Sequence, residues 1–185
     1  MPLVLAPSGQ AANLAQAVSF ADEVLRLVNQ RRHVAGKIPL RMQKNLIAAA
    51  QGHARDMAAR NYIAHRNPEG QSVGARIDAE GYKGWVYAGE NIGAGHTTPE
   101  QIVTAWWNST GHRRNMLDGD FIEAGVGYCY QADDAAGVVL WNGVSGGPYY
   151  HYWVLDLARR KAPAFLPLVL SRVNALIGRV KRAHS

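Results

Sequence analysis

The chain has 185 residues, of which 48% are hydrophobic and 18% are charged, and its formal net charge is +6. This length and composition are typical of one folded domain and exclude an intrinsically disordered chain. Residues 159–185 hold seven of the 20 Lys and Arg residues and none of the 14 acidic residues, so the rest of the chain is nearly neutral. A basic face for nucleic acid is therefore not expected.

Membrane and cysteine signals are weak. No apolar run approaches the ~20 residues that cross a bilayer. The first seven residues contain an apolar run of only four, too short for a secretory signal, so we expect no signal peptide in this chain. Cys129 is the single cysteine, which excludes an internal disulfide and a Cys-based zinc site, and we expect it in a buried strand.

The first half of the chain predicts helices. Residues 1–15 are small and polar, and we expect a disordered segment or a linker. Apolar residues then recur at helical spacing over residues 17–34 and 43–60, with His53 on the apolar stripe of the second helix. A short helix over residues 73–80 is predicted to stop at Gly81.

The middle of the chain mixes element types. Glu90 lies in a glycine-flanked segment that favours a loop or a short strand. Thr98 to Gln101 form a capping box with Pro99 in the first turn, which predicts a helix start. That helix is expected to end near Ser109, followed by a short turn that brings up His112.

The second half predicts strands over residues 121–130, 138–144 and 149–157. Three consecutive strands after a helical half indicate an α+β domain with an antiparallel sheet packed against helices. In the C-terminal tail, residues 161–185, apolar residues recur at helical spacing with Arg172, Arg179 and Arg182 on the remaining face. This basic amphipathic helix is expected either to contact an anionic membrane through residues 165–182 or to pack on the domain or a second chain.

Three short segments carry the best candidates for chemistry: Tyr62–Gly70 with His65, Ala88–Gly93 with Glu90, and Trp106–Leu117 with His112. Two imidazoles and a carboxylate can share a divalent metal, such as Zn²⁺, or act together as acid and base. The alternative is that these groups hydrogen-bond each other and backbone amides to order a cleft.

Taken in chain order, these segments resemble the CAP superfamily. The resemblance also includes Leu25–Asn29, Ala54–Met57, Arg76–Tyr82, Gly125–Gly127 and Tyr152–Trp153. This SCP-like family includes cysteine-rich secretory proteins, antigen 5 and pathogenesis-related proteins. The resemblance is to its compact, disulfide-free bacterial branch. It implies that residues 16–160 form one domain, a three-layer α-β-α sandwich with a central antiparallel sheet.

The resemblance also implies a cleft with two His residues and, in many members, two acidic residues. His65, Glu90 and His112 match three of these positions, with both His and Glu90 as metal ligands, or Glu90 as base for a bound water. Ser109 stands where eukaryotic members tend to have Glu, and Glu123 is a candidate to compensate. Asn91, Ser109, Asn115 and Glu123 are expected to support the cleft.

For function, the resemblance implies a secreted or periplasmic protein that binds a small apolar or lipid ligand or an extracellular protein. The heavy aromatic content either lines a ligand groove or builds the core; the groove candidates are Trp106, Tyr150, Tyr152 and Trp153. The alternative function is a divalent-metal-dependent, peptidase-like hydrolase that uses His65, Glu90 and His112. A third is an interaction module anchored by the tail. We favour binding over catalysis.

Overall fold

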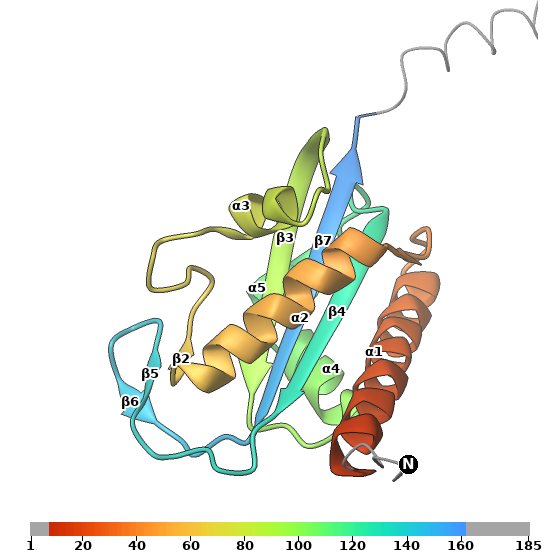
Figure 1. The fold of residues 1–185 in the computed structure, drawn as a ribbon. Helices are drawn as coiled ribbons and strands as arrows, with labels where there is room; N and C mark the ends of the chain where they lie inside the picture. Colours follow the sequence, from red (N-terminus) through yellow and green to blue (C-terminus); the bar gives the residue numbers. More distant parts are fainter. Residues whose placement is uncertain (1–7, 162–185) are drawn as a thin grey trace, which may run out of the picture.

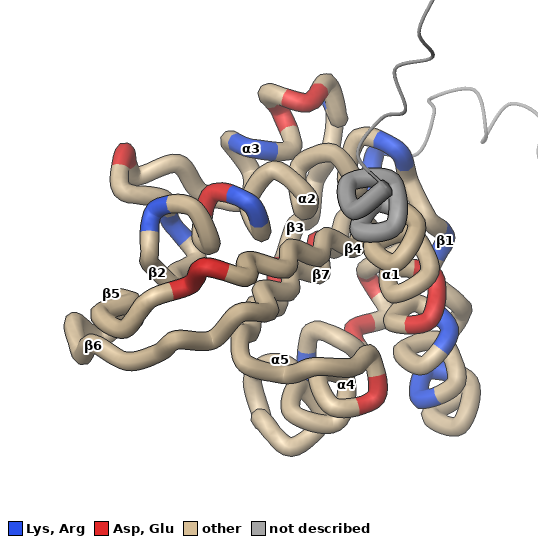
Figure 2. The backbone as a smooth tube through the Cα atoms, turned by 60° about the horizontal axis from the view of Figure 1, so that its bottom comes forward, with Lys and Arg blue, Asp and Glu red and all other residues tan. Residues whose placement is uncertain are grey.

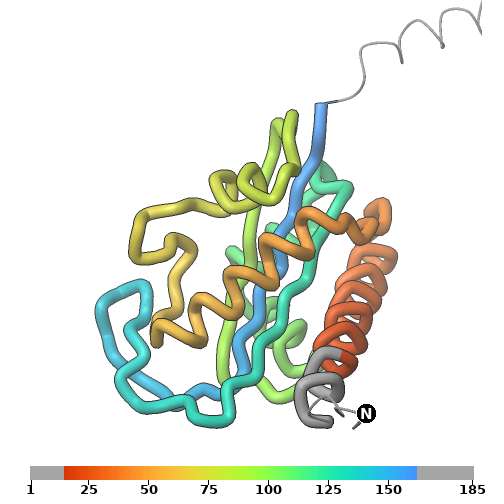
Figure 3. The backbone as a smooth tube through the Cα atoms, viewed as in Figure 1, coloured from red at the N-terminus to blue at the C-terminus, as the bar shows by residue number. Residues whose placement is uncertain are grey.

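The centre of the computed structural model is a sheet of three long strands. The model describes the backbone of residues 8–161 and the side chains of residues 15–161. Strand β7 (His151–Arg160) lies between β4 (Glu123–Tyr130) and β3 (Trp85–Ala94) (Figure 3). It is antiparallel to both. The two-residue strand β1 (Arg41–Met42) adds to β4 in parallel. Strand β3 is therefore an edge of this sheet.

Helices cover both faces of the sheet. Helices α2 (Lys44–Ala59) and α3 (Val73–Ala79) lie on one face, while α1 (Ser8–Val34), α4 (Pro99–Asn108) and α5 (Thr110–Leu117) lie on the other (Figures 1 and 2). The predicted three-layer α-β-α sandwich with a central antiparallel sheet is confirmed, apart from the short parallel strand β1.

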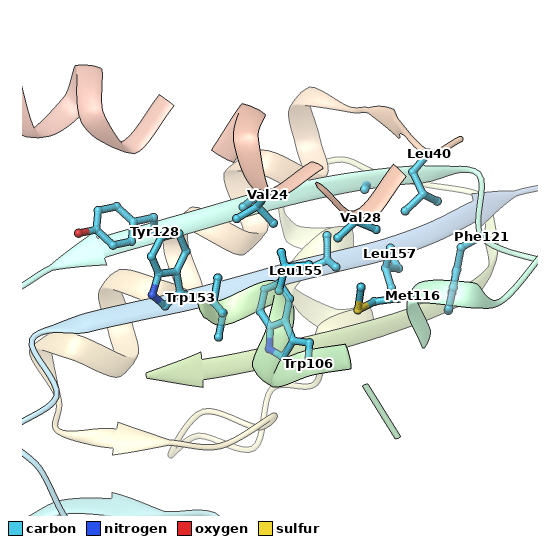
Figure 4. Close-up of a cluster of buried hydrophobic side chains, with 14 residues drawn as sticks. Val24, Val28, Leu40, Trp106, Met116, Phe121, Tyr128, Trp153, Leu155 and Leu157 are labelled. Atoms are coloured by element: carbon cyan, nitrogen blue, oxygen red, sulfur yellow. The ribbon is translucent and has the colours of Figure 1, made fainter. Parts of the chain in front are cut away.

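Two hydrophobic layers hold the sandwich together. On the α1 and α4 face, Val24 and Val28 pack with Trp106 and Trp153, and the whole cluster is almost fully buried (Figure 4). On the other face, α2 packs directly on the backbone of β4. A Cβ atom added to Gly125 would lie 2.0 Å from the carbonyl carbon of Leu46, so only glycine fits there.

Several boundaries differ from the predictions. Helix α1 begins at Ser8, so residues 8–15, expected to be disordered or a linker, are part of the helix; this stretch contains three alanines, one glutamine and one leucine, which are strong helix formers. Residues 110–117 form helix α5 and not a short turn. The segment of Glu90 is a ten-residue strand, longer than expected. The predicted tail helix lies outside the described residues.

The predicted strand over residues 138–144 is also shorter than expected. Only β5 (Val138–Leu140) is a strand, and it belongs to a second small sheet with β2 (Tyr62–Ile63) and β6 (Ser145–Gly146). Gly143 has a φ of 79° and its N–H donates to the carbonyl of Leu140, so the chain turns back on itself here. This turn keeps the segment out of the central sheet.

The local helix signals are confirmed. The Thr98 hydroxyl accepts from the backbone N–H of Gln101 at 3.3 Å, and Pro99 opens α4. The Gln101 side chain accepts a hydrogen bond from the backbone N–H of Thr97, one residue before the Thr98 N–H that a capping box would use. Gly81 follows α3 with a φ of 80°. This is the left-handed conformation that ends many helices.

Candidate functional site

The candidate site is built around the buried carboxylate of Glu90 on β3. Glu90 is 5% exposed, and each of its oxygens has a partner. Oε1 lies 2.8 Å from Nδ1 of His65, and Oε2 accepts from Nη2 of Arg76 at 2.5 Å. Burial by itself would raise the pKa of Glu90, but the His65 hydrogen bond and the Arg76 charge hold the pKa below its ordinary value.

Arg76 connects the Glu90 carboxylate to the backbone of the segment that carries His65. Its side chain comes from α3, is nearly buried, and also donates to the backbone carbonyls of His65 and Gln71, at 3.0 Å each. Arg76 therefore fixes both the carboxylate and the segment that carries His65. In the sequence, Arg76 stands within the segment Arg76–Tyr82 of the family resemblance, which predicts no role for it.

Among the residues that the structure describes, only one ring nitrogen of His65 has a hydrogen-bond partner. Its Nδ1 is engaged by Glu90, which leaves Nε2 for a ligand, and its side chain is 55% exposed. A carboxylate bonded to one imidazole nitrogen orients the ring and makes the other nitrogen a better ligand. Glu90 therefore acts on His65 in this structure, where a direct metal ligand was expected.

His112 approaches from the other face of the sheet, across the edge strand β3. Asn91 donates to the backbone carbonyl of His112 at 3.1 Å, and Asn115 donates to the carbonyl of Glu90 at 3.2 Å and to the Asn91 side chain at 3.0 Å. These bonds attach α5 to β3. Burial lowers the pKa of His112, and the nearby His65 lowers it further.

The other two expected support residues lie elsewhere. Ser109 separates α4 from α5 at the N-cap position of α5, where its side chain makes no capping hydrogen bond. Glu123 accepts a hydrogen bond from the Tyr82 hydroxyl at 2.6 Å. In the strand register Glu123 lies two strands away from Glu90 and is also shifted along the sheet, opposite Ala158. Glu123 therefore does not supply a second carboxylate to the cleft.

The second carboxyl group of the site is Asp156, which was not among the predicted site residues. Asp156 lies directly opposite Glu90 in the register of β3 and β7 and is fully buried. Burial raises its pKa well above the ordinary value, and the neighbouring Glu90 charge raises it further. Among the described residues neither side-chain oxygen of Asp156 has a hydrogen-bond partner, and the raised pKa favours its protonated, uncharged form. The available signal was a lone acid in an otherwise apolar strand.

His53 is a core residue, as predicted. It is 1% exposed, and its Nε2 lies 3.0 Å from the carbonyl of Ala64 and 3.7 Å from Glu90. Burial lowers the pKa of His53, so its ring is neutral at pH 7. His53 therefore belongs to the buried polar cluster around Glu90 and is not accessible to a ligand.

The arrangement does not fit a three-ligand metal centre. Both Glu90 oxygens are already engaged, and among the residues that the structure describes no group of three His, Cys, Asp or Glu side chains could hold a metal ion. Only the two imidazoles remain as candidate ligands. A pair of ligands gives a weak and exchangeable site.

The aromatic groove candidates divide into two groups. Trp106, Tyr152 and Trp153 are 1% exposed or less and belong to the core, where Trp106 donates to the carbonyl of Ile92 at 2.9 Å. Tyr150 is 39% exposed and lines an open pocket. The core alternative therefore describes the first three residues, and an accessible surface remains only at Tyr150.

Comparison with protein families decides the classification. The family model described as "CAP: Cysteine-rich secretory protein family" matches residues 25–157. The chain belongs to the CAP family. Its single cysteine agrees with the disulfide-free branch of that family.

Two proteins of Bacillus subtilis (strain 168) are similar to this chain. The uncharacterised protein YkwD is 38% identical over 112 residues, which are 60% of this chain and 42% of YkwD. The uncharacterised membrane protein YlbC is 33% identical over 105 residues, 57% of this chain and 30% of YlbC. The matches thus cover less than half the length of either relative.

Solved structures share the CAP fold. An extracellular protein with an SCP domain from Bacillus anthracis superposes with a TM-score of 0.67 at 24% identity, covering 84% of this chain and 45% of that one. An outer surface protein of Borrelia burgdorferi gives a TM-score of 0.58 at 17% identity, covering 75% of this chain and 90% of that one. Within residues 8–161 of this CAP chain, every helix is too short or too polar to span a membrane.

Proposed function

We propose that this CAP-domain protein is a secreted or periplasmic binding protein that captures a lipid-like ligand with an acidic head group. The observation that carries the proposal is an open groove of about 810 Å³ along the C-terminal half of α1, with Trp107 of α4 as its aromatic wall. This volume falls in the range of small-molecule sites, about 300–1,000 Å³.

The chemistry of the groove suits an anionic amphiphile. The Arg31 guanidinium lies 4.6 Å from the centre of the Trp107 ring, and that of Arg113 lies 5.8 Å from it. Val34, also in the lining, is 88% exposed. The described lining residues include two arginines and no acid, but Arg26 is already paired with Glu23 beside the groove, so Arg31 is the cation that remains for a ligand. An alkyl chain can cover the ring and the valine while an arginine pairs with a carboxylate or phosphate.

A secreted location is supported by the Bacillus anthracis neighbour, which is described as an extracellular protein. An extracellular protein partner is the other ligand class that the family resemblance implies.

Contact of residues 165–182 with an anionic membrane is a separate part of the proposal, because basic segments are attracted to anionic surfaces. Co-sedimentation with anionic vesicles, with and without residues 161–185, tests it; equal binding by both forms would remove the tail from the proposal.

The groove is tested by calorimetric titration with a long-chain fatty acid below its micelle concentration, and with the alcohol of the same length. Trp107→Ala should abolish binding of both. Arg31→Gln should weaken the acid about tenfold, which is ~1.4 kcal/mol, and leave the alcohol unchanged. Trp141→Ala is the matched control, because Trp141 is 76% exposed and outside the groove. Unchanged fatty-acid binding in Trp107→Ala would reject the groove.

A second candidate function is weak binding of a divalent cation such as Zn²⁺ by His65 and His112. It is favoured by the Glu90 contact that leaves Nε2 of His65 free. A bound cation would supply Lewis acidity at the cleft. Calorimetric titration of Zn²⁺ into metal-free protein tests it, with the double variant His65→Ala/His112→Ala as the control. Equal heats in the two proteins would make the cluster purely structural.

The hydrolase alternative has less support. A general base must be free to take a proton, whereas both Glu90 oxygens are engaged by His65 and Arg76. Metal-stimulated peptide hydrolysis that is lost in Glu90→Gln would favour the hydrolase over the binding protein.

A further inference from the structure

A second open pocket lies at the end of the central sheet, where β3 ends and β7 begins. Its volume is about 550 Å³. The lining brings together three tyrosines and two histidines: Tyr130, Tyr149, Tyr150, His96 and His151. In the part of the chain that the structure describes, no Asp, Glu, Lys or Arg is among the residues that line it. This pocket shares no lining residue with the groove at Trp107, and Glu90, His65 and Arg76 lie outside its lining.

Two tyrosines of the pocket are accessible from solvent. Tyr130 is 44% exposed and Tyr150 is 39% exposed. Tyr150 also has a φ of 60°. This left-handed conformation costs a residue other than glycine about 1 kcal/mol or more, and it persists only where the surroundings hold it in place.

The residue that holds Tyr150 in place is Asp134. Its Oδ2 atom accepts from the backbone N–H groups of Tyr149 and Tyr150, at 2.7 and 2.8 Å, and from the Tyr152 hydroxyl at 2.9 Å. Asp134 is 8% exposed; burial would raise its pKa, but these hydrogen bonds hold the pKa below its ordinary value. These bonds hold the backbone of Tyr149 and Tyr150 in place without a ligand, which lowers the entropic cost of binding.

The histidines add neutral polar atoms. Nδ1 of His151 lies 2.8 Å from the hydroxyl of the buried Tyr128, which leaves Nε2 of His151 for another partner. Burial lowers the pKa of His96 and of His151, so both rings are uncharged at neutral pH. The pocket therefore offers aromatic faces, hydroxyls and imidazole nitrogens without formal charge.

We infer that this aromatic pocket binds a neutral saccharide. A pyranose ring has an apolar C–H face that can lie against a tyrosine ring, and hydroxyls at its rim that exchange hydrogen bonds with tyrosine O–H and imidazole nitrogen. An anionic or cationic ligand would find no side-chain charge of opposite sign in the lining. A lipid chain would leave the hydroxyls and imidazoles without partners, which costs binding energy.

The test is a titration of the full chain with three neutral oligosaccharides: the tetramers of N-acetylglucosamine, of β-1,4-linked glucose and of α-1,4-linked glucose. Binding is followed by chemical-shift changes of backbone amides at residues 94–97 and 149–151. The variants are Tyr130→Ala and Tyr150→Asn; asparagine tolerates the left-handed conformation, so this change removes the ring without adding strain. Trp141→Ala removes an exposed aromatic residue outside the pocket and serves as the control.

We expect at least one tetramer to shift the pocket amides, with each tyrosine variant weakening its binding about tenfold or more and Trp141→Ala leaving it unchanged. Circular dichroism establishes that each variant is folded. If none of the three saccharides shifts the pocket amides, the inference is overturned. The same holds if binding survives in both folded tyrosine variants or falls equally in the Trp141 control.

Discussion

Replacing Arg76 by methionine tests the electrostatic centre of the cleft. Arg76 is 8% exposed and donates at 2.5 Å to Glu90, which is 5% exposed, so the variant leaves a buried carboxylate without its cation. Breaking a buried ion pair in this way typically costs about 3–5 kcal/mol. Because His65 still contacts the carboxylate, we expect the lower end, about 3 kcal/mol.

A double-mutant cycle isolates the interaction. Glu90→Gln removes the uncompensated charge, so adding it to Arg76→Met should recover part of the lost free energy of unfolding. The measurement is urea unfolding followed by tryptophan fluorescence. Lys83→Met is the control, because Lys83 forms only an exposed pair with Asp78 at 3.6 Å. Loss of such a surface pair should change stability by about 0.5 kcal/mol or less.

The cost of Arg76→Met should also depend on pH. The folded protein holds the pKa of Glu90 below its ordinary value of 4.5. The stabilisation from the ionised carboxylate is therefore complete above about pH 4.5 and is lost as the pH falls through the lower, folded pKa. The two proteins should differ most at pH 7 and converge in acid. A cost below about 1 kcal/mol at pH 7, or strictly additive effects of the two substitutions, would refute the reasoning.

Three further predictions concern the core. A Cβ atom in Gly125→Ala would lie 2.0 Å from the backbone of α2, whereas Gly119→Ala has open space around it. The first change should cost roughly 3 kcal/mol or more, and the second should change the thermal midpoint little. Asp156→Asn should stabilise the protein relative to the unsubstituted chain, and this gain should be larger at pH 7 than at pH 4. The reason is that the folded pKa of Asp156 is raised above its ordinary value. That raised pKa costs about 1.4 kcal/mol for each pH unit between the unfolded and the folded pKa. An unchanged pH profile of unfolding would contradict a protonated Asp156. Trp106→Phe leaves the Ile92 carbonyl buried without its donor. It should lose about 1–3 kcal/mol in urea unfolding, and full stability would show that this bond contributes nothing.

Local signals carried much of the fold. The apolar stripe of α2, the Thr98 cap of α4 and the glycine after α3 depend on residues within about one helical turn, and all three are found where the sequence predicts them. The motif order also sufficed for the family, because it identifies a known arrangement of elements. The length of β3 was underestimated, since its partner in the sheet is β7, a segment from the far end of the domain.

The site itself depended on tertiary structure. The sequence, through its resemblance to the CAP superfamily, predicted one cleft with His65, Glu90 and His112 and with Asn91 and Asn115 as supports. The structure shows His65 bonded to Glu90, and Asn91 bonded to the His112 carbonyl and to Asn115. The sequence did not reveal that Arg76 occupies the second oxygen of Glu90 or that Asp156 lies opposite Glu90 across the strands. The physical reason is that hydrogen bonding, burial and strand register between distant segments determine which charge faces which. None of these quantities is a property of a local residue pattern.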